Sequence, residues 1–335
     1  MMEVSKMNKK IWVFAEYVNC ILDKVTLELL TKAKQLALEL EGETEVAAVI
    51  LGYKISEDTC NTLASYGADK VYVANSEELS LYNPSIYSPI IIDLVKKEDP
   101  DIFLFGATAI GSELGPTVAV ELKAGVAAHC VDMRIDDNGH LVSLVPSFGG
   151  KILGEISCPY NRPEMASVKP GIFVQGEPEE KNAVIETIDV SNIKADDYPL
   201  KAIGVEKKEI KGVPLEKADI VFCGGYGIGG KENWSKLETL AAIFGGAAAC
   251  TRPTVDEGWS PGEHVMIGTS GKSIRPKVYM GFGVSGATHH ICGMKDSTLV
   301  INVNKDEKAS IFEVSDVGIA EDAGKVLDQL ISRLS

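Results

Sequence analysis

The feature that most constrains the fold of this chain is a regular alternation of short apolar runs with longer stretches of helical periodicity. In the first half the apolar runs are IWVFAEY (11–17), TEVAAVIL (44–51), DKVYVA (69–74) and DIFLFGAT (101–108), and helical patterns cover 25–41, 56–66 and 85–98. Strands that alternate with helices of this length form parallel sheets, because each helix returns the chain to the starting edge. The pattern predicts an α/β domain.

The character changes after a helical pattern at 112–123. Four strand-like runs follow with few helices between them: AHCVDMRID (128–136), HLVSLVPSF (140–148), KILGEIS (151–157) and EMASVKPG (164–171). We expect them to complete the same domain, joined by hairpins.

A charged segment at 177–216 precedes a second alternation, so we place a domain boundary near residue 205. The second series contains strands in ADIVFCGG (218–225), AAACTRPT (247–254), KVYMGFG (277–283), STLVINVN (297–304) and IFEVSD (311–316), with helices at 232–245, from about 286 and from about 320. The sequence therefore predicts two open, mostly parallel α/β domains, 1–205 and 206–335, the second of them Rossmann-like.

Charge and hydropathy exclude several classes of protein. Acidic residues outnumber basic ones by 48 to 33, and the resulting net charge of −15 disfavours binding to nucleic acid. No uncharged apolar run approaches the roughly 20 residues that insert into a membrane. The N-terminal apolar run soon meets Glu16 and reads as a first strand and not a signal peptide, and the seven cysteines contain no C-x-x-C pair. We expect a cytoplasmic protein with reduced, structural thiols.

Three glycine-rich turns follow strands of the second domain, where open α/β sheets place their ligands. They are CGGYGIGGKE (223–232), IGTSGKS (267–273) and GFGVSGATHH (281–290). Glycine lets the backbone approach phosphate oxygens closely, so the turns favour a nucleotide site. The alternative is that the glycines only shape turns and let helices pack on the sheet.

Two sharper nucleotide motifs fail. In GYGIGGKE the residue after the lysine is Glu232, where a Walker loop needs Ser or Thr for magnesium, and in GTSGKS the first glycine is replaced by Met266. The turn at 281–286 has the G-x-G-x-x-G spacing, but the next strand ends in Asn304 and not in the acid that holds a ribose in nicotinamide sites. The sequence therefore excludes a nucleoside triphosphatase and weakens the nicotinamide interpretation.

The segment RPKVYMGFGVSGATHHICGM (275–294), followed by INVNKD (301–306) and IFEVSDVGIAED (311–322), resembles the FAD-binding domain of the electron transfer flavoprotein alpha subunit. The resemblance extends upstream through GTSGK, TRPTVD, NRPEMASVKPG and VFAE, and covers nearly the whole chain. It implies a heterodimer with a beta subunit, the first domain at the subunit interface and one FAD in the second. The implied activity is electron transfer between a dehydrogenase of the acyl-CoA type and NADH, ferredoxin or a respiratory acceptor.

The resemblance also implies roles for individual residues. Ser285 and the amides of Gly286 and Ala287 would bind the pyrophosphate, His290 would lie at the flavin N1 and C2 carbonyl, and Arg252 would lie over the ring near N5. Thr251, Thr269 and Ser270 would bond the ring edge or the ribityl chain, and Asn304, Lys305 and Asp322 would hold the adenosine half. Gly227, Gly283 and Val284 complete the expected cofactor-binding set, and no metal ligand or bond-making catalytic residue is implied. A hydrogen-bond donor such as His290 or a cation such as Arg252 would stabilise a negatively charged reduced flavin and raise its potential.

The sequence departs from the family pattern at several positions. Tyr226 stands where many members carry Arg, and Thr269 where many carry Gln beside the flavin C4 carbonyl. In the first domain Ser112, Ala128 and His129 replace residues found in members that bifurcate electrons, so bifurcation is not inferred.

Other readings of these residues stay open on sequence alone. Arg252 could be a surface ion pair, and adjacent helical positions let at most one of His289 and His290 reach a ligand. The chain could instead be an NADH-dependent reductase subunit that binds nicotinamide at the 281–286 turn, or a nucleotide sensor that uses its first domain. A visible spectrum of the chain purified with its partner separates these readings, because only a flavoprotein is yellow.

Overall fold

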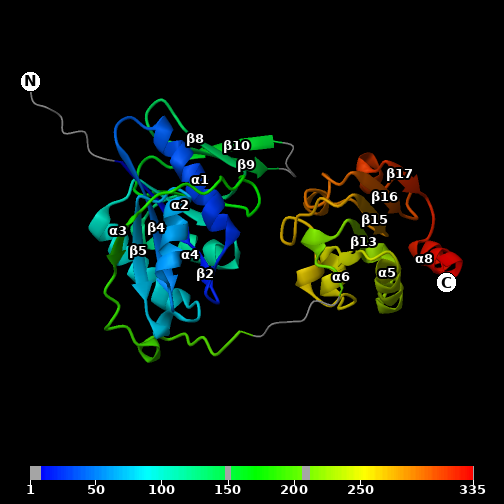
Figure 1. The fold of residues 1–335 in the computed structure, drawn as a ribbon. Helices are drawn as coiled ribbons and strands as arrows, with labels where there is room; N and C mark the ends of the chain where they lie inside the picture. The colour runs from blue at the N-terminus through cyan, green and yellow to red at the C-terminus, as the bar shows by residue number, and fades with distance from the viewer. Residues whose placement is uncertain (1–8, 148–151, 206–211, 335) are drawn as a thin grey trace, which may run out of the picture. The chain divides into compact units, whose positions relative to one another are not determined.

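The computed structural model describes residues 9–147, 152–205 and 212–334, which form two compact units, one in each half of the chain (Figure 1). Each unit is a parallel sheet covered by helices, so the predicted α/β class is confirmed. The domain boundary expected near residue 205 lies beside 206–211, which are outside the described residues.

The first unit is built on a seven-stranded parallel sheet with the order β12-β5-β4-β1-β6-β11-β7. The strands are β1 (Lys9–Ala15), β4 (Thr44–Gly52), β5 (Lys70–Asn75), β6 (Ile102–Gly106), β7 (Val126–Cys130), β11 (Glu164–Val168) and β12 (Val184–Thr187). A two-stranded ribbon of β2 (Tyr17–Val18) and β3 (Ile21–Leu22) follows β1.

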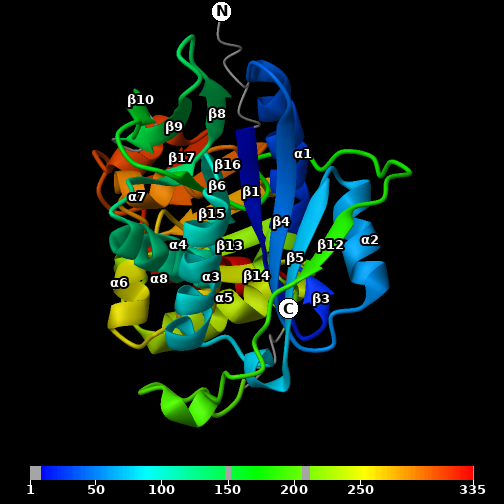
Figure 2. The same cartoon turned by 90° about the vertical axis from the view of Figure 1, so that its left-hand side faces the viewer.

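Helices cover both faces of this sheet (Figure 2). They are α1 (Lys24–Glu39), α2 (Glu57–Ser65), α3 (Pro84–Glu98) and α4 (Ala109–Leu122). Successive strand residues point to opposite faces, so Ile11 and Val13 pack with α1 and α2, whereas Trp12 and Phe14 pack with α3 and α4. All four side chains are at most 2% exposed, which explains why β1 reads as a continuous apolar run.

The hairpin expectation for 128–171 is only partly correct. Strands β8 (Asp132–Ile135), β9 (Leu141–Ser147) and β10 (Ile152–Ser157) form a separate antiparallel sheet. Strand β11, however, lies parallel between β6 and β7, and all five of its residues are buried. A strand buried on both faces belongs in the middle of a parallel sheet.

The second unit holds a five-stranded parallel sheet with the order β14-β13-β15-β16-β17. Its strands are β13 (Ile220–Gly224), β14 (Ala247–Cys250), β15 (Val278–Phe282), β16 (Leu299–Val303) and β17 (Val317–Ile319), and its helices are α5 (Lys231–Ile243), α6 (Arg252–Asp256), α7 (Thr288–Ile291) and α8 (Ala323–Leu334). Helices α5 and α8 pack on one face, and side chains of the 267–274 loop and Ile311 pack on the other. No helix in the described parts of either unit is long and apolar enough to cross a membrane.

The strand expected at 311–316 is wrong. Residues Ser310–Val314 form a 3-10 helix, and the last strand is β17. Ile311 is fully buried, and its amide donates to the carbonyl of Ser285. The apolar residues of this segment therefore belong to a short 3-10 helix that packs on the sheet, and not to a strand. The helix expected from about 286 begins at Thr288.

The chain leaves β13 toward one edge of the second sheet and leaves β15 toward the other. The two connections therefore diverge beyond the carboxyl ends of β13 and β15, and in open α/β sheets this divergence leaves a crevice for a ligand.

Candidate functional site

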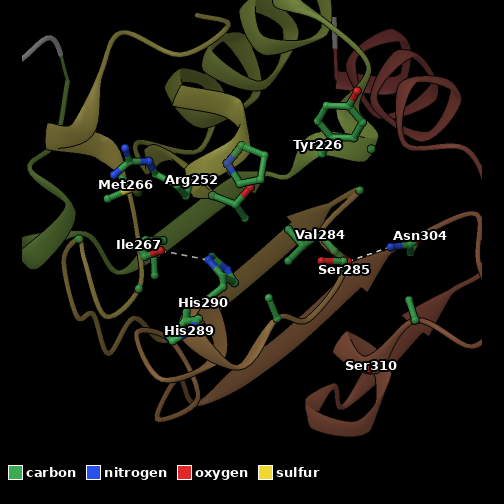
Figure 3. A pocket seen from close by; sticks show the side chains of 18 of the residues that line it. Tyr226, Arg252, Met266, Ile267, Val284, Ser285, His289, His290, Asn304 and Ser310 are labelled. Carbon is green, nitrogen blue, oxygen red and sulfur yellow. Dashed lines mark hydrogen bonds between the residues drawn. The ribbon is translucent and has the colours of Figure 1, made fainter. Parts of the chain in front are cut away.

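A cavity of about 610 Å³ lies at this crevice (Figure 3). The residues that line it follow four parallel strands. They are Tyr226 and Gly227 after β13; Thr251, Arg252, Pro253 and Met266–Gly271 after β14; Gly283, Val284, Ser285, Ala287, His289 and His290 after β15; and Asn304, Asp306, Lys308, Ala309 and Ser310 after β16. All three glycine-rich turns found in the sequence contribute.

Two of these turns are joined through their backbones. The amide of Gly225 bonds the carbonyl of Phe282, and the amide of Gly227 bonds the carbonyl of Gly283, both at 2.9 Å. A Cβ atom built on Gly283 would lie 2.3 Å from the carbonyl carbon of Gly227, and the φ of Gly283 is +66°. Gly286 is as constrained, because its φ is +89° and its Cβ would lie 2.1 Å from the amide nitrogen of Ile311. These positions need glycine on steric grounds as well as for backbone conformation.

The turn after β15 carries main-chain amides without an acceptor in the described residues, and Val284, Ser285 and Ala287 of this turn line the cavity. Within the described residues no hydrogen bond has the main-chain amide of Val284, Ser285, Gly286 or Ala287 as its donor. The side chain of Asn304 fixes the turn by donating to the carbonyl of Val284 at 2.8 Å (Figure 3). Ser285 and Ala287 are exposed, so their amides are open to a ligand, and consecutive free amides suit the oxygens of a phosphate. The turn therefore fits the diphosphate of a dinucleotide.

Arg252 lies at the rim of the cavity on the first turn after β14. Its Nε donates to Asp256 at 2.8 Å, and Nη1 lies 3.5 Å from Glu263. These carboxylates, Asp256 foremost, raise the pKa of the guanidinium further above its usual value, and the side chain is 56% exposed. The ion pair considered from the sequence exists, and it holds a permanent positive charge beside the cavity.

The two adjacent histidines of α7 have different surroundings. His289 is exposed, and its Nδ1 lies 3.2 Å from the hydroxyl of Thr269. His290 is 5% exposed; its Nε2 lies 2.7 Å from the hydroxyl of Tyr279, and its Nδ1 lies 3.1 Å from the carbonyl of Ile267 (Figure 3). Burial lowers the pKa of His290 to about 4. The ring of His290 thus has protein partners at both nitrogens and offers no unused N–H to a ligand.

Most of the residues expected at the site line the cavity. They are Gly227, Thr251, Arg252, Thr269, Ser270, Gly283, Val284, Ser285, Ala287, His290 and Asn304. Gly286 shapes the turn against Ile311, while Lys305 and Asp322 are exposed and outside the lining. Asp322 accepts from the amide of Lys325 at the start of α8.

The sequence reading missed the wall made by Asp306, Lys308, Ala309 and Ser310. The predicted strand begins only at 311, and the sequence gives no role to 306–310. In the structure the amide of Ile311 bonds the carbonyl of Ser285, and residues 306 and 308–310 line the cavity. The signals that could have revealed the turn in 304–308 are Asn304 and Asp306, whose side chains bond the amides two residues ahead.

Comparison with known proteins gives matches along nearly the whole chain. The family model described as the electron transfer flavoprotein domain matches residues 11–193, and the model described as the electron transfer flavoprotein FAD-binding domain matches 214–295. The electron transfer flavoprotein subunit alpha of Clostridium acetobutylicum is 39% identical over 97% of each chain. Protein FixB of Clostridium saccharobutylicum is 37% identical over 97% of this chain and 96% of the relative. The acryloyl-CoA reductase electron transfer subunit beta of Anaerotignum propionicum is 34% identical over 97% of this chain and 95% of the relative.

Proposed function

Because the chain belongs to the electron transfer flavoprotein alpha-subunit family, we propose that it carries electrons on an FAD held in the cavity of the second unit. One observation carries this assignment. The four main-chain amides of 284–287 have no acceptor among the described residues, and they follow β15 at the point where the strand order of the sheet reverses. When bound, the isoalloxazine ring of FAD accepts and releases electrons reversibly.

The cavity suggests how the cofactor would be held. We assign the diphosphate to the amides of Ser285, Gly286 and Ala287, because these donors are free and adjacent. The flavin end then falls toward Arg252 and Thr269, and the adenosine end toward Asn304 and the 306–310 wall, which line the cavity at the carboxyl ends of β14 and β16 respectively.

At the flavin end the chain offers hydroxyl groups for hydrogen bonds and one positive charge. The hydroxyls of Thr251, Thr269 and Ser270 are available to hydrogen-bond a polar ring edge or ribityl chain. Arg252, fixed by Asp256, places a positive charge where negative charge accumulates on reduction. Removing that charge is expected to make reduction less favourable without altering the main-chain contacts to the diphosphate.

The alpha-subunit family implies a beta subunit as partner. We propose that β10 contributes to the surface that meets it, because this edge strand exposes Ile152, Leu153 and Ile156, which are 55%, 54% and 38% exposed. An open strand edge with apolar side chains is a ready surface for pairing with another chain.

We also propose an acyl-CoA dehydrogenase as redox partner. One relative is named as an electron transfer subunit of acryloyl-CoA reductase, which is an enzyme of acyl-CoA chemistry. The second redox partner would be NADH, ferredoxin or a respiratory acceptor. A cytoplasmic location agrees with the seven free cysteines, since reducing compartments keep thiols unpaired.

The decisive experiment is coexpression with a beta subunit from the same organism, followed by a visible spectrum and a redox titration of the purified heterodimer. We expect flavin absorption bands that are lost when the chain carries Gly283→Ala, which distorts the diphosphate turn. A colourless heterodimer that binds NADH at the same turn would refute the assignment and support the reductase reading. If the flavin stays bound to Gly283→Ala, it lies in another site.

A further inference from the structure

His290 and Tyr279 form a buried pair behind the cavity that the cofactor assignment above does not use. Tyr279 projects from β15 and is fully buried, and His290 projects from α7 and is 5% exposed. Their rings are tilted by 51° with centroids 6.0 Å apart, and Tyr279 Oη lies 2.7 Å from His290 Nε2. The hydrogen bond is short and shielded from water, so it is a fixed part of the site.

The partners of His290 determine its tautomer. The carbonyl of Ile267, 3.1 Å from Nδ1, can only accept, so Nδ1 carries the proton. In a neutral imidazole Nε2 then holds a lone pair, and the hydroxyl of Tyr279 is the donor that satisfies it. A protonated ring would instead donate from both nitrogens and would leave the hydroxyl hydrogen of Tyr279 in need of another acceptor.

The surroundings of the pair favour the neutral ring. Cys223 of β13 lies 3.9 Å from Nε2, with Cys250 of β14 beyond it, and in the described parts of the chain no carboxylate bonds or ion-pairs with His290. Burial raises the pKa of both Tyr279 and Cys223 and lowers that of His290. All three groups are therefore uncharged near neutral pH.

We propose that Tyr279 is a positioning residue for the flavin site, whose hydroxyl holds His290 as the neutral Nδ1–H tautomer so that the imidazole forms an uncharged part of the cavity wall. Arg252, and not His290, then supplies the positive charge at the flavin end. The consequence for the flavin rests on the proposed function, whereas the tautomer is a property of the chain itself.

The first test measures the tautomer directly. Nitrogen NMR of the heterodimer labelled with ¹⁵N in its histidine rings distinguishes protonated from unprotonated ring nitrogens, and the His290→Asn variant assigns the signal by its loss. We expect His290 to show a protonated Nδ1 and an unprotonated Nε2 from pH 5.5 to 8, without titration. A proton on Nε2, or titration near pH 6.5, would overturn the proposal, and this measurement does not depend on any Tyr279 variant folding.

The second test removes the hydroxyl. In Tyr279→Phe we expect the ¹⁵N signal of His290 Nε2 to shift toward that of an unprotonated nitrogen without a hydrogen-bond donor, because the hydroxyl that bonds it is gone, while burial still keeps the ring from titrating between pH 5.5 and 8. Tyr160→Phe is the matched control, because Tyr160 is 95% exposed in the first unit. Unchanged ring signals in Tyr279→Phe would remove the positioning role. A wild-type heterodimer without flavin would refute the proposed function while leaving the tautomer measurement valid.

Discussion

The amide nitrogen of Gly227 lies 2.9 Å from the carbonyl oxygen of Gly283, so the turn after β13 and the turn after β15 are joined by their main chains. This contact fixes the two turns against each other at the cavity, which residues of both turns line. A side chain at either glycine would push the turns apart, because its Cβ would lie within 3 Å of the opposite backbone.

Gly283→Ala should therefore abolish retention of FAD and destabilise the second unit by about 2 kcal/mol or more, since it combines overpacking with a strained positive φ. The matched control is Gly245→Ala, whose φ is +62° but whose Cβ would meet nothing within 4 Å. The control isolates the conformational cost of about 1 kcal/mol and should keep its flavin. Flavin content per heterodimer and thermal unfolding report both effects; equal losses in the two variants would show that the contact with Gly227 is unimportant.

Much of this arrangement could be predicted from the sequence. The apolar runs located the sheet strands because buried parallel strands need no polar alternation, and the glycine-rich turns located the cavity because only glycine allows two turns to approach as Gly227 and Gly283 do. Asn304 and Asp306 signal a turn in 304–308, but the position of the 306–310 wall at the cavity could not be predicted, because it depends on a bond between residues far apart in sequence, Ser285 and Ile311. The orientation of His290 could not be predicted either. His289 and His290 are the same residue type at neighbouring helical positions, and only the structure shows that it is His290 that faces Tyr279.

Removing the charge of Arg252 should lower the reduction potential of bound FAD. In Arg252→Ala the flavin stays bound, because the main-chain amides of 284–287 are untouched, but the positive charge that favours reduction is lost. The shift should be modest and should shrink as salt is added, because the side chain is about half exposed. Arg252→Lys should retain most of the wild-type potential.

Arg275→Ala is the control for Arg252→Ala, since Arg275 is an exposed arginine of the same unit that pairs with Asp296 and does not line the cavity. Redox titration of all three heterodimers under the same conditions gives the comparison. An identical potential in wild type and Arg252→Ala would place Arg252 away from the flavin end.

A cation at position 226 should strengthen cofactor binding. Tyr226 lines the cavity, is 59% exposed and stacks on Trp259 with ring centroids 5.5 Å apart. Tyr226→Arg places a guanidinium beside the diphosphate turn, so we expect slower loss of FAD during dialysis at low salt and no gain at 1 M salt. Tyr226→Gln removes the same aromatic contact without adding charge, and should hold FAD no better than wild type. If both variants behave alike, charge at this position does not reach the cofactor.

The buried His290 should make the second unit sensitive to acid. Its pKa is about 4 in the folded protein because burial disfavours the charged ring, whereas an unfolded histidine titrates near 6.5. Between these values the unfolded chain binds the additional proton, so the free energy of unfolding falls as the pH drops from about 6.5 toward 4, by at most about 3 kcal/mol. Hydrogen exchange of the amides in β15 and β16 follows the stability of this unit alone.

His290→Asn should weaken that acid sensitivity. The variant has no titrating ring, so the difference in unfolding free energy between pH 7 and pH 5 should be smaller than in wild type, even where the variant is less stable at both values. His264→Asn, a histidine of the same unit without a bond to Tyr279, serves as the control and should retain the wild-type difference. If His290→Asn destabilises the unit more at pH 5 than at pH 7, the folded protein stabilises the protonated ring, and the neutral pair with Tyr279 does not exist.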